Sequence, residues 1–338
     1  MEYLEDVPLS TLTTMRLGGL ARYVAQVSTP DDLVQAVAFA RKNGLPWFVL
    51  GGGSNVVARG DYPGLIVLNR IEGFACIAED DSTASYCIGA GEVWDEVVER
   101  LVEAGLSGVE GMSDIPGYAG STPIQNVGAY GQEIADTLVE LEAYDTNSNG
   151  FVTLSAADCG FAYRNSIFKD PRARHHIITS ITLRLNKKAL EPPFYPSLEG
   201  YLGAHGITDY SPASIRRAVN AIRGDKLPDP LEIASAGSFF KNPLVDKAVA
   251  LALLERYPGM PQWDMPQGKV KLAAGWLIDQ AGLKSYCAHG LQIYPKNALV
   301  VINLSAHTAD ELDAFTSEVS DAVQAMFGVT LEQEPESL

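Results

Sequence analysis

Hydrophobic residues follow two different spacings in the first part of the chain. Over residues 31–43 they recur every three to four positions, as Leu33, Val37 and Ala40 do, and Asn43-Gly44 ends the pattern. This spacing predicts an amphipathic helix. Continuous apolar runs at 47–50 and 65–68 predict short strands on either side of a glycine-rich loop. The chain therefore begins as a mixture of helix and strand.

The middle of the chain repeats this mixture with more strands. We expect a strand near 86–88 and a helix over 94–104, which Gly105 closes. Further strands are predicted at 139–144, 151–154 and 177–185, with a hairpin turn at 147–150. Three prolines between 192 and 196 predict an irregular connection.

The last part is predicted to be richer in helix. Helical patterns cover residues 213–223, 244–256, 270–281 and 308–327, and a strand is expected at 299–302. With 338 residues the chain is too long for one ordinary core. We therefore expect three parts, at residues 1–69, 70–214 and 215–338.

Composition narrows the class of protein. Apolar residues make up 46% and charged residues 20% of the chain, which is typical of folded proteins. The net charge is −17 and no stripe of Lys or Arg is visible, which argues against nucleic acid as a partner. A phosphate site would have to be built locally from a few cations and backbone N–H groups.

The cysteines and the N-terminus indicate a reducing compartment. The four cysteines show neither CxxC nor zinc-site spacing, so we expect reduced thiols and no metal site. The first residues are acidic and no long apolar run is present, so we expect neither a signal peptide nor a membrane contact. The sequence thus predicts a cytoplasmic protein.

The first chemical signal is a glycine loop, Gly51-Gly52-Gly53-Ser54-Asn55, directly after an apolar strand. Without Cβ atoms the backbone can approach a ligand, and successive N–H groups can bind a pyrophosphate. A tight turn between strands is an equally good interpretation of the loop alone. The loop does not open a helix as the dinucleotide fingerprint does, and it lacks the Lys of a phosphate-binding P-loop.

A second glycine-rich stretch runs from Ile115 to Gly131 and includes the sequence Pro123-Ile124-Gln125-Asn126-Val127-Gly128-Ala129-Tyr130-Gly131. Loops of this length inside a domain are uncommon and usually functional. Small residues here would let the backbone lie along a flat ring. The alternative is a loop that merely caps a sheet.

Together with Thr13-Thr14, the two loops are similar to the FAD-binding half of vanillyl-alcohol-oxidase-like flavoproteins. The run from Ile115 to Gly131 more specifically resembles the larger form of the UDP-N-acetylenolpyruvoylglucosamine reductase family. The resemblance implies an α+β protein with a two-part FAD-binding region of this type, at 1–69 and 70–214, and a separate substrate-binding domain at 215–338. It also implies non-covalent FAD, because Ser54 and Asn55 stand where some relatives carry a flavin-linked histidine. The implied FAD-binding residues are Gly51, Gly52, Gly53, Ser54, Asn55, Gly117, Ser121, Thr122, Gln125, Asn126 and Gly128.

Three further motifs carry the implied chemistry. Arg164 lies among aromatic residues, where its fork fits a carboxylate, although an exposed strand-edge arginine is the simpler interpretation. Ser238 lies between Gly237 and two phenylalanines and could donate a proton or only satisfy a turn. The acidic C-terminus alone indicates a solvated tail. The resemblance makes Arg164, Ser238 and Glu334 catalytic, although Pro335 departs from the family pattern.

The same resemblance implies substrate contacts that residue types alone would not single out. They are Tyr163, Lys226, Asn242, Lys284 and Asn297, and a tyrosine that closes over the substrate, for which Tyr201 is our prediction and Tyr195 and Tyr210 are alternatives.

The implied reaction reduces UDP-N-acetyl-enolpyruvoylglucosamine to UDP-N-acetylmuramate for peptidoglycan. NADPH reduces FAD, flavin N5 gives a hydride to the vinyl carbon, and Ser238 protonates the neighbouring carbon. Arg164 and a protonated or hydrogen-bonding Glu334 stabilise the intermediate charge. We expect a monomer with these two small-molecule partners. An FAD oxidase of the same superfamily and a non-catalytic nucleotide-sugar binding protein remain as alternatives.

Overall fold

The chain folds into two compact units in the computed structural model, which describes residues 1–338 except for the side chain of Pro171. Unit 1 comprises Met1–Asp6, Ala21–Gly52 and Pro63–Asp225, and unit 2 comprises Val7–Leu20, Gly53–Tyr62 and Lys226–Leu338. The predicted boundary at residue 69 lies within unit 1, and the one at 214 lies eleven residues before its end. The three-part division stays a prediction.

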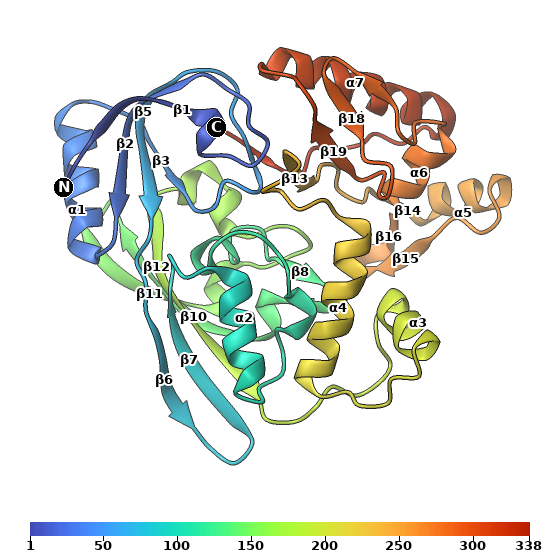
Figure 1. The fold of residues 1–338 in the computed structure, drawn as a ribbon, viewed down its shortest axis with the longest axis horizontal. Coiled ribbons are helices and arrows are strands. Elements are labelled where there is room, and N and C mark those ends of the chain that lie inside the picture. Colours follow the sequence, from blue (N-terminus) through green and yellow to red (C-terminus); the bar gives the residue numbers. More distant parts are fainter. The chain divides into compact units, whose positions relative to one another are not determined.

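Unit 1 contains a four-stranded sheet with the order β1-β2-β5-β3 and one covering helix (Figure 1). The strands are β1 (Leu4–Pro8), β2 (Leu20–Val27), β3 (Trp47–Leu50) and β5 (Tyr62–Asn69). Helix α1 (Pro30–Lys42) begins with a capping box, in which Thr29 and Asp32 each accept the other's backbone N–H. Its apolar face packs on the sheet, so the predicted amphipathic helix is confirmed.

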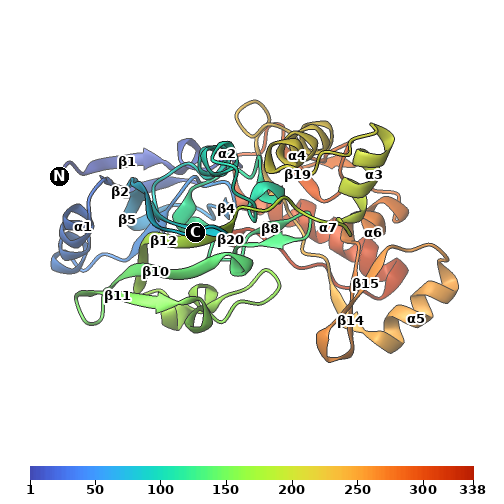
Figure 2. The same ribbon diagram turned by 90° about the horizontal axis from the view of Figure 1, so that it is seen from below.

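Unit 1 also contains a five-stranded antiparallel sheet with the order β11-β10-β12-β7-β6, whose strands are labelled in Figure 1. Figure 2 shows β10, β11 and β12 of this sheet from another side. Its strands are β6 (Phe74–Glu79), β7 (Thr83–Gly89), β10 (Leu138–Asp145), β11 (Gly150–Ser155) and β12 (His176–Asn186). Helix α2 (Trp94–Glu103) buries Trp94, Val97 and Leu101 in the same hydrophobic cluster as the sheet. The predicted hairpin turn at 147–150 joins β10 to β11 and is confirmed.

Two helices, α3 (Pro196–Ala204) and α4 (Pro212–Lys226), complete unit 1 and pack on each other through Leu198, Leu202 and Val219. The predicted irregular connection at 192–196 is therefore only partly correct, because Pro196 opens α3. Proline is favourable at the first helical position, where no N–H is needed. Arg216 of α4 forms a bidentate ion pair with Asp95 of α2, at 2.6 and 3.0 Å.

Unit 2 contains a four-stranded and a three-stranded sheet, which share one hydrophobic core. One has the order β13-β19-β18-β17 and the other β14-β16-β15. Helices α5 (Lys247–Arg256), α6 (Ala274–Gln280) and α7 (Ala309–Phe327) pack with Phe239 and Phe240 in one hydrophobic cluster. The strands are β13 (Ser235–Ser238), β14 (Leu244–Asp246), β15 (Gln262–Met265), β16 (Lys269–Leu272), β17 (Cys287–Ala288), β18 (Leu291–Ile293) and β19 (Val300–Asn303).

Two predicted helices of unit 2 begin later than expected. Residues 244–246 and 269–272 form the paired strands β14 and β16, so α5 begins at Lys247 and α6 at Ala274. Strand pairing overrode the apolar pattern there. The predicted helix at 308–327 is confirmed as α7, which a Thr308–Glu311 capping box opens.

Short elements make up the remainder. The chain ends in β20 (Glu336–Ser337), which pairs in parallel with β4 (Val56–Val57) in unit 2. In unit 1, β8 (Gly128–Ala129) pairs with β9 (Gln132–Glu133). None of the helices in the described part of the chain is long and apolar enough to cross a membrane. The 3-10 turns are Leu9–Thr11, Glu110–Met112, Ala119–Ser121, Ile134–Asp136, Ala156–Cys159, Ile167–Lys169, Pro171–Ala173 and Pro266–Gly268.

Candidate functional site

The two glycine loops meet in unit 1. A Cβ atom on Gly52 would lie 3.0 Å from the Cα of Gly117 and 3.4 Å from the ring of Tyr118. One on Gly51 would lie 2.4 Å from the Ser121 hydroxyl. Only glycine permits so close an approach of the two backbones. The structure therefore brings Gly51 and Gly52 together with Gly117 and Ser121, as the shared ligand predicted from the sequence requires.

This cradle suits an anion. Within the described residues, the N–H groups of Gly51, Gly52 and Gly117 donate no hydrogen bond to the protein. Arg70 adds a positive charge, since its guanidinium donates to the Gly51 carbonyl at 3.3 Å and lies 4.2 Å from the centre of the Tyr118 ring. Unsatisfied N–H groups beside a cation fit the pyrophosphate of FAD. Arg70 was not predicted from the sequence, because this residue directly follows β5 and belongs to no recognisable motif.

The end of the first loop belongs to unit 2. Gly53 has a positive φ of 63°, and its carbonyl accepts hydrogen bonds from the Thr14 N–H at 3.1 Å and the Thr14 hydroxyl at 3.4 Å. Asn55 accepts through its carbonyl from the Glu336 N–H at 2.9 Å. Gly53 and Asn55 are thus fixed to the N-terminal and C-terminal segments of this unit.

The second glycine loop is held by its own side chains. Asn126 is buried, and its amide donates to the Glu133 carboxylate at 2.7 Å and to the Ala162 carbonyl at 3.3 Å. Its side-chain oxygen accepts from the Ala135 N–H at 3.1 Å. Thr122 is also buried and donates to the Ala119 carbonyl at 2.7 Å. These two residues shape the loop, so their predicted contact with FAD stays a prediction.

Arg164 stands at the tip of a tight turn that is bound to the second glycine loop. Ala162 and Asn165 exchange two backbone hydrogen bonds of 3.0 Å, which leaves Tyr163 and Arg164 at the corner. Arg164 has φ of 50°, a costly conformation for a residue with a side chain. Its guanidinium donates to the Gly128 carbonyl at 2.9 Å and lies 5.7 Å from the Tyr163 ring centre. This constraint is typical of a residue held in place for function.

Ser238 and Glu334 lie on neighbouring segments of unit 2, although they are distant in sequence. Ser238 ends β13, where a register shift between Ser235 and Ser238 interrupts the pairing with β19. The Glu334 N–H donates to the Phe239 carbonyl at 2.8 Å, and Phe240 pairs with Gln333. Both Ser238 and Glu334 are half-buried. A bulge that redirects a side chain is common beside active sites.

The other predicted substrate residues of unit 2 have mixed surroundings. Asn242 accepts from the Ala274 N–H at 2.9 Å and so caps α6, and Asn297 accepts from the Leu299 N–H at 3.1 Å. Lys226 and Lys284 are exposed. The two asparagines therefore have structural tasks, and the two lysines are accessible to a charged ligand.

The three candidate tyrosines lie at different places in unit 1. Tyr195 is 39% exposed and its ring meets Tyr130 of the second glycine loop edge to face at 5.9 Å. Tyr201 stacks on His205 of its own helix at 4.0 Å, and Tyr210 packs on Phe194. Of the three, Tyr195 has the described contact with the loop, and the prediction of Tyr201 as the closing residue stays a prediction.

A half-buried cation, Arg223, accompanies this tyrosine pair. Arg223 of α4 donates to the Asp114 carbonyl at 3.0 Å and lies 3.5 Å from the Asp114 carboxylate. Burial lowers the pKa of Arg223, and Asp114, Tyr130 and Asp95 oppose that shift. Burial also raises the pKa of Tyr130, which Arg223 partly offsets. Sequence reasoning missed Arg223, although its i, i+7 spacing from Arg216 places both on one face of α4.

Comparisons with known proteins show to which family the chain belongs. Residues 21–153 match the family model described as FAD binding domain, and residues 229–338 match UDP-N-acetylenolpyruvoylglucosamine reductase, C-terminal domain. The chain is 44% identical over 331 residues to the UDP-N-acetylenolpyruvoylglucosamine reductase of Ralstonia nicotianae, with 97% of each chain covered. It is 39% identical to the enzyme of that name from Chromobacterium violaceum, covering 99% of this chain and 98% of the relative.

The fold agrees with a solved relative as well. The crystal structure of UDP-N-acetylenolpyruvylglucosamine reductase from Thermus caldophilus superimposes with a TM-score of 0.67 at 25% identity, covering 99% of this chain and 98% of that one. The α+β flavoprotein fold predicted from the sequence is therefore confirmed. On these matches, the chain belongs to the UDP-N-acetylenolpyruvoylglucosamine reductase family.

Proposed function

We propose that this protein is the FAD-dependent reductase that converts UDP-N-acetyl-enolpyruvoylglucosamine to UDP-N-acetylmuramate with NADPH. The observation that carries the proposal is the meeting of the two glycine loops, whose unsatisfied N–H groups and Arg70 suit a pyrophosphate. Bound FAD would supply hydride transfer. The glycine cradle of unit 1 would hold its pyrophosphate, and Tyr118 with Arg70 would close one side of that cradle.

The chain's own residues divide the remaining tasks. The Arg164 guanidinium, fixed by Gly128, would bind the substrate carboxylate and stabilise negative charge that develops there. Ser238 would give its hydroxyl proton to the α-carbon. Glu334 would hydrogen-bond to the charged intermediate in its protonated form, because an ionised carboxylate would repel it.

The substrate diphosphate requires cations in a protein of charge −17. We assign this role to Lys226 and Lys284, both exposed. Asn242, Asn297 and Tyr163 are proposed as further substrate contacts. We also propose that the protein acts as a cytoplasmic monomer.

Tyr195 rather than Tyr201 is proposed to close over the substrate, because it contacts Tyr130 next to Gly131. Tyr195→Ala should raise KM for the nucleotide sugar roughly 10- to 100-fold, as expected for loss of about 1.4–2.7 kcal/mol of substrate binding. Steady-state kinetics at saturating NADPH measures the change. Tyr201→Ala is the matched control and should stay within a few-fold of wild type. The reverse pattern would restore Tyr201 as the closing residue.

The activity itself is tested with purified protein. We expect a yellow solution that NADPH bleaches and that UDP-N-acetyl-enolpyruvoylglucosamine then recolours, with a product two hydrogens heavier by mass spectrometry. Acid precipitation should leave the yellow colour in the supernatant, since the flavin is not covalently attached. Recolouring by oxygen alone at an undiminished rate would favour an oxidase, and colourless protein that binds the nucleotide sugar would favour a binding protein.

A further inference from the structure

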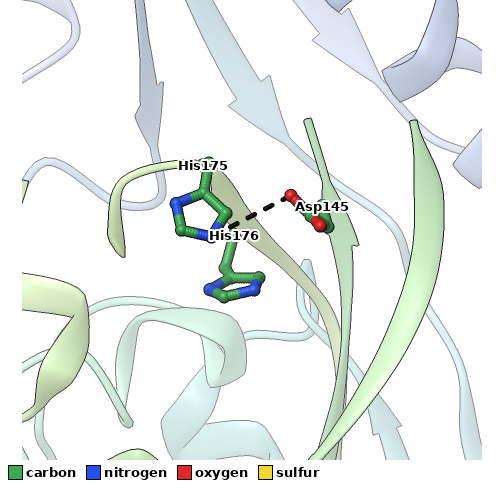
Figure 3. Close-up of side chains that lie close together, drawn as sticks. All are labelled: Asp145, His175 and His176. Atoms are coloured by element: carbon green, nitrogen blue, oxygen red, sulfur yellow. Dashed lines mark ion pairs between the residues drawn. The ribbon is translucent and has the colours of Figure 1, made fainter. Parts of the chain in front are cut away.

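Two histidines and one carboxylate gather in unit 1, outside the residues proposed for catalysis (Figure 3). Asp145 ends β10 and pairs in register with His176, the first residue of β12, which His175 directly precedes. One ligand atom from each of the three side chains lies within 4.8 Å of the other two. The His175 Nε2 atom is 3.9 Å from the Asp145 carboxylate.

The hydrogen bonds around the cluster fix which atoms face inward. His175 Nδ1 lies 2.8 Å from the Arg172 carbonyl, which can only accept, so Nδ1 carries the proton. The lone pair of neutral His175 is then on Nε2, toward Asp145. The Asp145 carboxylate accepts from the Asn147 N–H at 2.8 Å, which holds it in place. Donation of the second ring nitrogen to a backbone carbonyl is the usual support of a metal-binding histidine.

The three side chains of the cluster are not joined to one another by described hydrogen bonds. The distance of 3.9 Å from Nε2 to the carboxylate is too long for a hydrogen bond. The buried Nδ1 of His176 has no hydrogen-bond partner among the residues that the structure describes. Asp145 contributes the negative charge that an aspartate ordinarily carries at neutral pH. The His175 Nε2 lone pair, the Asp145 carboxylate and a ring nitrogen of His176 thus gather within 4.8 Å of one another, an arrangement that a cation would stabilise.

We propose that Asp145, His175 and His176 form a binding site for a divalent transition-metal ion of the zinc class. Imidazole and carboxylate ligands suit Zn²⁺ and its neighbours, whereas Mg²⁺ and Ca²⁺ prefer oxygen alone. With metal–ligand bonds of about 2.1 Å, tetrahedral ligand atoms are roughly 3.4 Å apart, so small side-chain rotations would close the site. Three protein ligands leave a coordination position for water.

Such an ion would tie the end of β10 to the segment that enters β12. A backbone hydrogen bond of 2.8 Å from the Thr146 N–H to the His175 carbonyl already joins these segments. The site would therefore add stability to unit 1 rather than take part in the reduction. The proposal is independent of the proposed function, because its test measures metal binding and not turnover.

The test is isothermal titration of the FAD-containing protein with Zn²⁺, after dialysis against chelator, together with thermal unfolding. We expect one equivalent bound with Kd in the micromolar range or tighter, and a rise in Tm with Zn²⁺. His175→Ala and Asp145→Asn should each weaken Zn²⁺ binding at least ~10-fold. Loss of a residue that only supports a metal ligand already weakens binding by about that factor, and loss of a ligand should weaken it no less.

His289→Ala is the matched control, because His289 also lies beside one carboxylate, that of Glu318, at 3.0 Å, whereas the residues that the structure describes offer no third metal ligand there. It should leave Zn²⁺ affinity unchanged. Absence of saturable binding by wild type would overturn the proposal, as would an affinity that the His175 and Asp145 changes leave unaltered. In either case the cluster is an ordinary histidine–aspartate ion pair.

Discussion

Removing the Ser238 hydroxyl should separate the two halves of the catalytic cycle. In Ser238→Ala, NADPH should bleach the flavin absorbance at close to the wild-type rate, because this half needs no proton delivered to a substrate carbon. Recolouring by UDP-N-acetyl-enolpyruvoylglucosamine should slow by ~10²–10⁴-fold, the usual loss on removing a positioned general acid. Stopped-flow absorbance, with each half measured separately, gives both rates.

The matched control is Ser235→Ala on the same strand. Ser235 is buried and lies before the register shift, opposite Ile302, so its removal tests only packing of β13. It should change both rates by no more than a few-fold. If the Ser238 variant recolours within a few-fold of wild type, the proton comes from another group. Equal slowing of both halves, or loss of FAD, would instead indicate that Ser238 is structural.

Elements with strong local signals were predictable from the sequence. Helices α1 and α7 carry both a periodic apolar face and a Thr-x-x-acid capping box, so local and tertiary preferences agree. The β10–β11 hairpin is marked by Asn147-Ser148-Asn149-Gly150. The strands β14 and β16 were missed because each has only three or four residues and depends on its partner strand.

The candidate site was predictable in part for the same reason. The glycine loops and Arg164 stand in long contiguous motifs, and the structure brings the second loop and Arg164 together. Contacts between segments that are distant in sequence are not marked by a contiguous motif, so they could not be predicted. The neighbourhood of Ser238 and Glu334 arises from backbone hydrogen bonds between residues 239–241, directly after β13, and the C-terminal segment, where the residue types alone indicated a solvated tail. Arg70 likewise becomes notable only beside Tyr118.

Gly53 offers the strongest expected effect on stability. Gly53→Ala would place a Cβ atom 2.1 Å from the Leu12 carbonyl oxygen, at a φ of 63° that already disfavours alanine. The conformation and the clash together should lower the free energy of unfolding by roughly 3–5 kcal/mol. Urea unfolding of the apoprotein measures this loss. The same titration with excess FAD also reports any change in FAD affinity, because bound FAD stabilises the folded state.

Gly44→Ala isolates the conformational part of that loss. Gly44 has the same φ of 63°, but no described atom lies within 4 Å of the position its Cβ would take. Its replacement should therefore cost only about 1–2 kcal/mol, the price of a left-handed residue. The difference between the two variants measures how tightly the first glycine loop is held against Leu12 in unit 2. Equal losses would mean that the loop or the Leu12 backbone moves far enough to relieve the contact, and that the close approach does not explain why glycine stands at position 53.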